Sequence, residues 1–178
     1  GKRAGRFKPF ATLLIVATVY SLLYRLMPPD LSGVMKENAQ LVLLETLNSW
    51  MGKYYALMEL ALLPLFAFSS WLTMRAYGHN FVEHLVIQTY LAAQRICAGI
   101  FFIPHSLLGI AAAMLGSSVL SMAYLAGFLF TFTQIYSTRS PVPVLARSAL
   151  AIALFFSMLM VVALLGAMLL YRLKLIQP

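Results

Sequence analysis

The sequence predicts an all-α protein: a polytopic membrane helix bundle with about five transmembrane helices and one interfacial amphipathic helix. Of its 178 residues, 62% are hydrophobic and only 10% are charged, whereas ordinary soluble domains are about 25% charged. A soluble fold of this size could not bury so much apolar side chain, so lipid must surround most of it. No polar stretch is long enough for a second globular unit, and residues 1–178 are expected to form a single membrane domain.

Long apolar runs predict the individual spans. A helix rises about 1.5 Å per residue, so it needs about 20 mostly apolar residues to cross about 30 Å of hydrocarbon. Five runs meet or approach this length. The predicted spans are residues 9–26, 54–74, 81–103, 119–136 and 147–171. Pro104 and His105 are expected to end the third span.

Two further segments lie between these spans. Residues 38–51 place leucines and a methionine on one helical face, with polar residues elsewhere. This pattern predicts an amphipathic helix in the membrane interface, with Trp50, Tyr54 and Tyr55 at headgroup level. The apolar segment 106–116 has only 11 residues and is too short to cross alone. It could be a re-entrant segment, an interfacial segment or an extension of the next helix.

Basic residues predict the orientation and explain the net charge of +8. Four of them directly precede the first span: Lys2, Arg3, Arg6 and Lys8. Such a cluster favours a cytoplasmic amino terminus and contacts anionic headgroups. No aromatic residues alternate with basic ones on a polar surface, so nucleic acid is not an expected partner.

Glu59 and Arg95 are the two ionisable residues expected well inside the membrane. Counted from the turn that joins the second and third spans, each lies about 22–24 Å up its helix. A charge at this depth needs a partner, so we predict an ion pair, with Gln94 as a third member. The pair could hold the two helices together, or it could line a polar cavity that binds a headgroup, an ion or a proton. Arg95 could instead extend outward to the interface.

A second polar cluster opens the third span. It contains His79, Glu83, His84 and Gln88. Glu83 follows Asn80 by three residues, the spacing of a capped helix start. Glu83 and His84 are adjacent and should point in different directions. The histidine spacing matches a metal site only weakly, so no metal and no cofactor is predicted.

Catalytic groups are scarce in the rest of the chain. The sequence contains no phosphate loop, nucleophile motif or paired carboxylates, so no catalytic residue is assigned. Cys97 is the only cysteine, which excludes an intramolecular disulfide and a thiolate metal cage. Small residues four apart suggest surfaces for close helix packing. These pairs are Gly109/Ala113, Ala123/Gly127 and Ala163/Ala167.

Three stretches resemble an uncharacterised bacterial membrane family, a domain of unknown function in which a zinc ribbon usually precedes about five membrane helices. They are Gly1-Lys2-Arg3 with Phe7-Lys8-Pro9-Phe10, the motif Phe81-Val82-Glu83-His84-Leu85-Val86, and Gln134-Ile135-Tyr136 with Ser140. The six-residue motif resembles the aromatic-Val-Glu-His-Leu-Val motif of that family. The zinc ribbon is absent, which is consistent with Gly1 not being the native start. The second histidine common in the family is also absent.

The resemblance implies a fold and a multi-pass location in the bacterial inner membrane, but no activity. We expect a non-enzymatic accessory subunit or assembly factor that binds another membrane protein or itself. The alternative is a small transporter or lipid-handling protein that uses a polar pocket at Glu59 and Arg95. A membrane enzyme with Glu83 and His84 as an acid/base pair comes third.

Overall fold

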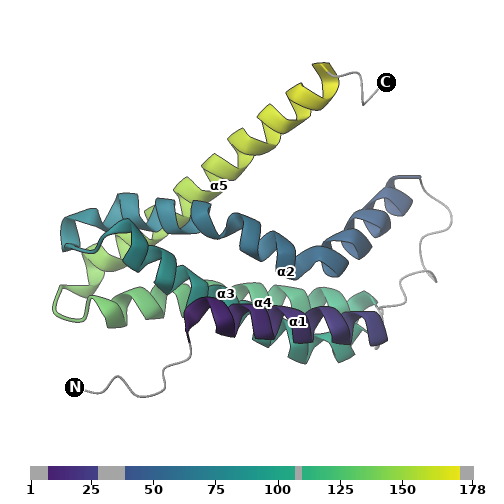
Figure 1. Ribbon diagram of the computed structural model, residues 1–178, viewed down its shortest axis with the longest axis horizontal. Helices are drawn as coiled ribbons and strands as arrows, with labels where there is room; N and C mark the ends of the chain where they lie inside the picture. The colour runs from purple at the N-terminus through teal and green to yellow at the C-terminus, as the bar shows by residue number, and fades with distance from the viewer. Residues whose placement is uncertain (1–7, 28–38, 107–109, 173–178) are drawn as a thin grey trace. The chain divides into compact units, whose positions relative to one another are not determined.

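The computed structural model describes residues 8–27, 39–106 and 110–172, and all regular elements within these ranges are helices (Figure 1). The elements are α1 (Pro9–Leu26), α2 (Ala39–Met74), the short 3-10 helix η1 (Arg75–Tyr77), α3 (Phe81–Ser106), α4 (Ile110–Ile135) and α5 (Pro141–Arg172). The predicted all-α class is confirmed.

Some predictions concern residues outside the described ranges. They include the basic cluster before Lys8, the first stretch of the family resemblance, Gly109 of one small-residue pair, and the start of the predicted interfacial helix at residue 38.

Four helical segments are long and apolar enough to cross a membrane, among the residues that the structure describes. They are Pro9–Leu26, Lys53–Tyr77, Ser118–Ile135 and Pro141–Leu169. These segments correspond to the first, second, fourth and fifth predicted spans. The third predicted span forms the 26-residue helix α3. Helix α3 is not among the four, and it carries Glu83 and Arg95 together with two glutamines and two histidines.

The helix boundaries differ from the prediction in three places. Helix α3 continues past Pro104 to Ser106, so this proline does not end it. Helix α5 begins at Pro141 rather than near residue 147, because proline is well tolerated in the first turn, where the amide hydrogen has no helical partner. Helix α4 begins at Ile110, so most of segment 106–116 extends the next helix, one of the three alternatives.

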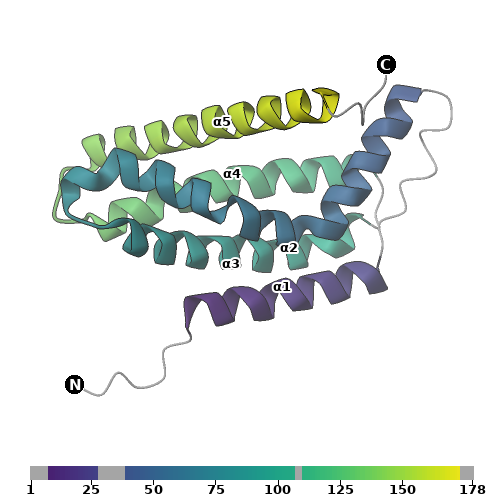
Figure 2. The same ribbon diagram turned by 45° about the horizontal axis from the view of Figure 1, so that its top comes forward.

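Helix α2 joins the predicted interfacial helix and the second span into 36 continuous residues, with Pro64 inside. In both ribbon views the first part of α2 leans away from the rest of that helix (Figures 1 and 2). The location of residues 38–51 in the membrane interface stays a prediction.

The chain divides into two compact units, and α2, α3 and α4 contribute to both. The first unit contains residues 1–63 and 86–128, and the second contains residues 64–85 and 129–178. The buried apolar side chains of the first unit include Leu13, Tyr20, Leu63, Leu91 and Ile96. Those of the second unit include Met74, Phe132, Val144, Ala151 and Phe155.

Candidate functional site

The predicted ion pair between Glu59 and Arg95 is present in the first unit. Arg95 Nη2 lies 2.7 Å from Glu59 Oε2, and Arg95 Nε donates to both carboxylate oxygens at 3.1 Å. The side chains are only 13% (Arg95) and 11% (Glu59) exposed. Two guanidinium nitrogens on one carboxylate form the strong, directional kind of charged hydrogen bond. The pair therefore joins α2 to α3.

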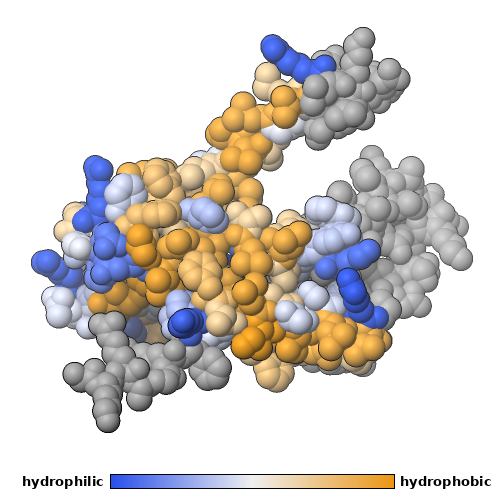
Figure 3. Space-filling model, viewed as in Figure 1, coloured by the Kyte–Doolittle hydropathy of each residue, from blue (hydrophilic) through white to orange (hydrophobic). Residues whose placement is uncertain are grey.

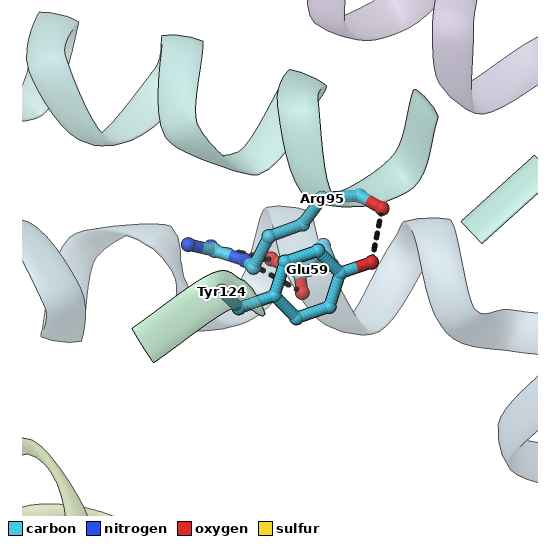
Figure 4. Close-up of polar contacts among 3 residues, drawn as sticks. All are labelled: Glu59, Arg95 and Tyr124. Carbon is cyan, nitrogen blue, oxygen red and sulfur yellow. Dashed lines mark hydrogen bonds and ion pairs between the residues drawn. The ribbon is translucent and has the colours of Figure 1, made fainter. Parts of the chain in front are cut away.

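Tyr124 of α4 completes this site from a third helix. Its hydroxyl donates a hydrogen bond of 2.6 Å to the main-chain carbonyl of Arg95 (Figure 4). The three residues thus connect α2, α3 and α4 at one level of the first unit. Sequence reasoning missed Tyr124, although a signal was present: a tyrosine within an apolar span needs a partner for its hydroxyl.

Two more tyrosines pack beside the ion pair. The ring centroids of Tyr20 and Tyr55 lie 5.2 Å apart, and Tyr55 interacts electrostatically with Glu59, Arg95 and Tyr124. A Cβ atom added at Gly99 would lie 3.5 Å from Tyr20 Cε2 and 3.7 Å from Tyr55 Cε1. Both rings therefore lie against the α3 backbone. The position of Tyr55 at headgroup level stays a prediction.

Gln94 does not join the ion pair as predicted. Its side chain is exposed, and it forms no hydrogen bond with Glu59 or Arg95 in the structure. Consecutive helix residues point about 100° apart, so Arg95 can reach α2 while Gln94 faces elsewhere. Gln94 instead lines a pocket of about 200 Å³ between α3 and α4, together with Arg95, Tyr124 and Gly127.

The second polar cluster centres on His84, which is fully buried in the second unit. His84 Nδ1 lies 3.1 Å from Ser70 Oγ, and Nε2 lies 3.4 Å from the Tyr136 hydroxyl. The His84 ring also stacks on Phe132, with centroids 6.0 Å apart. His79 packs its ring edge-on against Tyr136 at 5.0 Å. His84 is thus a satisfied core residue that connects α2, α3 and α4.

The capped start of α3 is confirmed. The Glu83 amide donates to Asn80 Oδ1 at 2.9 Å, and Glu83 Oε2 accepts from the Asn80 amide at 2.8 Å. This reciprocal pair is a capping box, which satisfies two amides that the helix start leaves free. Glu83 is exposed whereas His84 is buried, so the structure does not bring them together as an acid/base pair. Gln88 is also fully buried, but it belongs to the first unit.

Arg147, at the start of the predicted fifth span, makes a specific contact. Its Nη1 donates a 3.0 Å hydrogen bond to the carbonyl of Thr73, in the last turn of α2. Its guanidinium carbon lies 4.7 Å from the centre of the Tyr77 ring, and that of Arg139 lies 5.8 Å from the same centre. Helix ends leave carbonyls without helical partners, so Arg147 caps α2 and attaches α5 to it.

Among the described residues, no three His, Cys, Asp or Glu side chains gather closely enough to hold a metal ion. The Glu59–Arg95 pair and the two hydrogen bonds of His84 each join side chains from different parts of the chain.

The fold and its apolar surface fit the class of helical membrane proteins. No protein-family model, curated protein or solved structure matches the chain. The resemblance to the bacterial membrane family therefore stays a prediction.

Proposed function

We propose that this chain is a multi-pass membrane protein that binds another membrane protein, or a second copy of itself, as an accessory or assembly subunit. The observation that carries this proposal is the exposure of α5. Only 6% of the apolar 18-residue stretch of α5 is buried within the chain, whereas 39% of the corresponding stretch of Lys53–Tyr77 is buried. Every residue from 160 to 169 is exposed, which covers all sides of the helix. Figure 3 shows hydrophobic side chains along this part of α5.

Lipid alone could cover such a helix, but its small residues favour a protein neighbour. Ala163, Gly166 and Ala167 fall within one turn of each other on the exposed part of α5. A Cβ atom added at Gly166 would meet nothing within 4 Å. Small residues at this spacing let two membrane helices approach closely, and this approach is a main source of attraction between helices in lipid.

The proposal includes a location and a topology. We place the chain in the bacterial inner membrane with its amino terminus in the cytoplasm, because of the basic cluster that precedes α1. We also propose that α3 crosses the membrane as a fifth span. Its charged residue Arg95 is paired with Glu59, which lowers the cost of burying it.

Purification from the native membrane in mild detergent tests this function. The wild-type chain should bring down one protein at a fixed stoichiometry, or elute as a defined oligomer. Replacing Ala163, Gly166 and Ala167 by leucine should keep membrane insertion but release that partner, because the larger side chains separate the helices. A matched control carries Val161→Leu, Leu165→Met and Met168→Leu, and it should retain the partner. A wild-type chain that is monomeric and without a protein partner would contradict the proposal.

One observation favours a second candidate function, a small transporter or lipid-handling protein. The pocket of about 200 Å³ has polar groups from Gln94, Arg95 and Tyr124 on an otherwise apolar wall. Such a pocket is the usual form of a small-molecule site. Gln94→Leu should then abolish transport or lipid transfer while leaving folding intact, since Gln94 makes no hydrogen bond to the ion pair. An unchanged phenotype would remove this candidate.

A further inference from the structure

A second hollow lies in the first unit, between α1 and α2. Its volume is about 390 Å³. Leu14 and Leu22 of α1 and Leu57 and Leu60 of α2 supply most of its apolar wall, and Arg25 lies at one end. This groove shares no residue with the pocket beside Arg95.

The groove's hydroxyl groups do not make its wall polar. Thr18 Oγ1 donates to the Leu14 carbonyl at 2.8 Å, and Ser21 Oγ donates to the Ala17 carbonyl at 2.9 Å. Both hydroxyl hydrogens are therefore donated to main-chain carbonyls of α1. Apart from Arg25, the groove offers a surface suited to hydrocarbon.

Positive charge is concentrated at the Arg25 end. Arg25 is in the last turn of α1 and is exposed. Lys53, also exposed, precedes the groove residue Ala56 by about one helical turn on α2. Neither side chain has a carboxylate partner within the described residues. Next to Lys53, the rings of Trp50 and Tyr54 pack 5.0 Å apart, and such aromatic pairs are typical of headgroup level.

The length of the groove matches one leaflet of a bilayer. From Arg25 back to Leu14, α1 rises about 16 Å. Half of a hydrocarbon core of about 30 Å is about 15 Å. An acyl chain that starts at the Arg25 end would therefore reach the bilayer midplane at Leu14.

From this match of charge, polarity and length, we propose that the α1–α2 groove binds one anionic phospholipid. The lipid phosphate binds to Arg25 with Lys53 nearby, and one acyl chain lies between Leu22 and Leu14 of α1 and Leu57 and Leu60 of α2. The site is independent of the protein partner proposed for α5.

Native mass spectrometry of the detergent-purified chain tests the site with two added lipids, palmitoyl-oleoyl phosphatidylglycerol and palmitoyl-oleoyl phosphatidylcholine. The wild-type chain should retain the first lipid in preference to the second. Arg25→Gln with Lys53→Gln should lower retention of phosphatidylglycerol about thirtyfold, since each basic residue near an anionic headgroup contributes to the attraction. Arg139→Gln, also exposed but in the second unit, is the charge control and should change nothing.

A second variant tests the acyl chain. Thr18→Trp fills the groove and should reduce retention of both lipids, whereas Val19→Trp, on an exposed residue outside the groove, should not. Equal retention of the two lipids by the wild-type chain would overturn the proposal whatever the variants do. Displacement of the bound lipid by millimolar glycerol phosphate would also overturn it, since the acyl chain would then contribute nothing. Loss of preference only in the Arg25/Lys53 variant, with helicity unchanged, supports it.

Discussion

Arg95 illustrates how a helix of this protein carries a charge among apolar residues. An arginine at the centre of a bilayer costs at least about 2.5–3.5 kcal/mol on insertion scales. Here Glu59 accepts hydrogen bonds from two guanidinium nitrogens of Arg95. Tyr124 donates a further hydrogen bond to the main-chain carbonyl of Arg95. Pairing of this quality offsets much of the cost. It follows that leaving one of the two charges without its partner destabilises the protein more than removing both charges.

The first prediction concerns this ion pair. Glu59→Gln should destabilise the protein by about 3 kcal/mol, because it leaves a largely buried guanidinium unpaired. The exchanged pair, Glu59→Arg with Arg95→Glu, should recover a good part of that loss. Thermal unfolding in detergent measures both, and Gln94→Ala is the control on an exposed neighbour. If the exchanged pair restores protein abundance but not the cellular phenotype, the original pair has a functional role beyond joining the helices.

His84 leads to a second prediction at the residue scale. His84→Ala removes a fully buried ring together with its contacts to Ser70 and Tyr136. We expect a loss of about 2–4 kcal/mol, comparable to other large-to-small changes in a core. Glu83→Gln should have a small effect, since an amide can still accept the hydrogen bond from Asn80. Unaltered unfolding of the alanine variant would contradict the core role of His84, and loss of phenotype in a fully stable variant would restore the idea of a catalytic histidine.

At the scale of elements, the turn between α2 and α3 depends on Gly78. This residue has φ of +96°, a conformation that residues with a side chain adopt only with strain. The capping box at Asn80 and Glu83 follows immediately and starts α3. The chain can therefore reverse direction within a few residues.

Alanine substitutions at two glycines, Gly78 and Gly127, test this conclusion by comparison. A Cβ atom at Gly78 or at Gly127 would meet nothing within 4 Å, but only Gly78 has a positive φ. Gly78→Ala should therefore cost about 1–2 kcal/mol. Gly127→Ala should be neutral or stabilising, because alanine favours a helix interior by about 1 kcal/mol. Unfolding in detergent compares the two variants, and equal effects would contradict a strained turn.

The attachment of α5 to α2 depends on Arg147. Arg147→Met keeps an unbranched apolar side chain but removes the hydrogen bond to Thr73 and the charge over Tyr77. We expect a loss of about 1–2 kcal/mol and faster amide hydrogen exchange at the end of α2. Arg139→Met should have a smaller effect, since Arg139 is exposed and contributes only a longer contact to the same ring. Equal effects of the two variants would argue against capping by Arg147.

At the scale of the whole molecule, the open question of four or five crossings depends on α3. In a Cys97→Ser background, single cysteines can replace Met27, Arg75 and Ser140, all of which are exposed. With five crossings and a cytoplasmic amino terminus, a membrane-impermeant maleimide added to intact cells should label position 27 but neither 75 nor 140. Labelling at both 27 and 140 would show that α3 does not cross. Labelling at both 75 and 140 but not at 27 would indicate five crossings in the reverse orientation.

Hydropathy and local spacing determined the helical class, four of the apolar segments, the ion pair and the capped start of α3. These features depend on composition, on the rise of 1.5 Å per residue, and on residues three positions apart. Glu59 and Arg95 lie at similar distances along their helices from the turn that joins α2 and α3. Counting residues from that turn therefore predicted their pairing.

Only the tertiary structure showed which faces of the helices meet. A helix that is apolar on most sides gives no sequence signal for its rotation about its own axis. For this reason Tyr124, the close approach at Gly99 and the groove ending at Arg25 could not be predicted. The same absence explains why Gln94 was wrongly added to the ion pair. Depth along a helix follows from the sequence, whereas direction around it is decided by packing between helices.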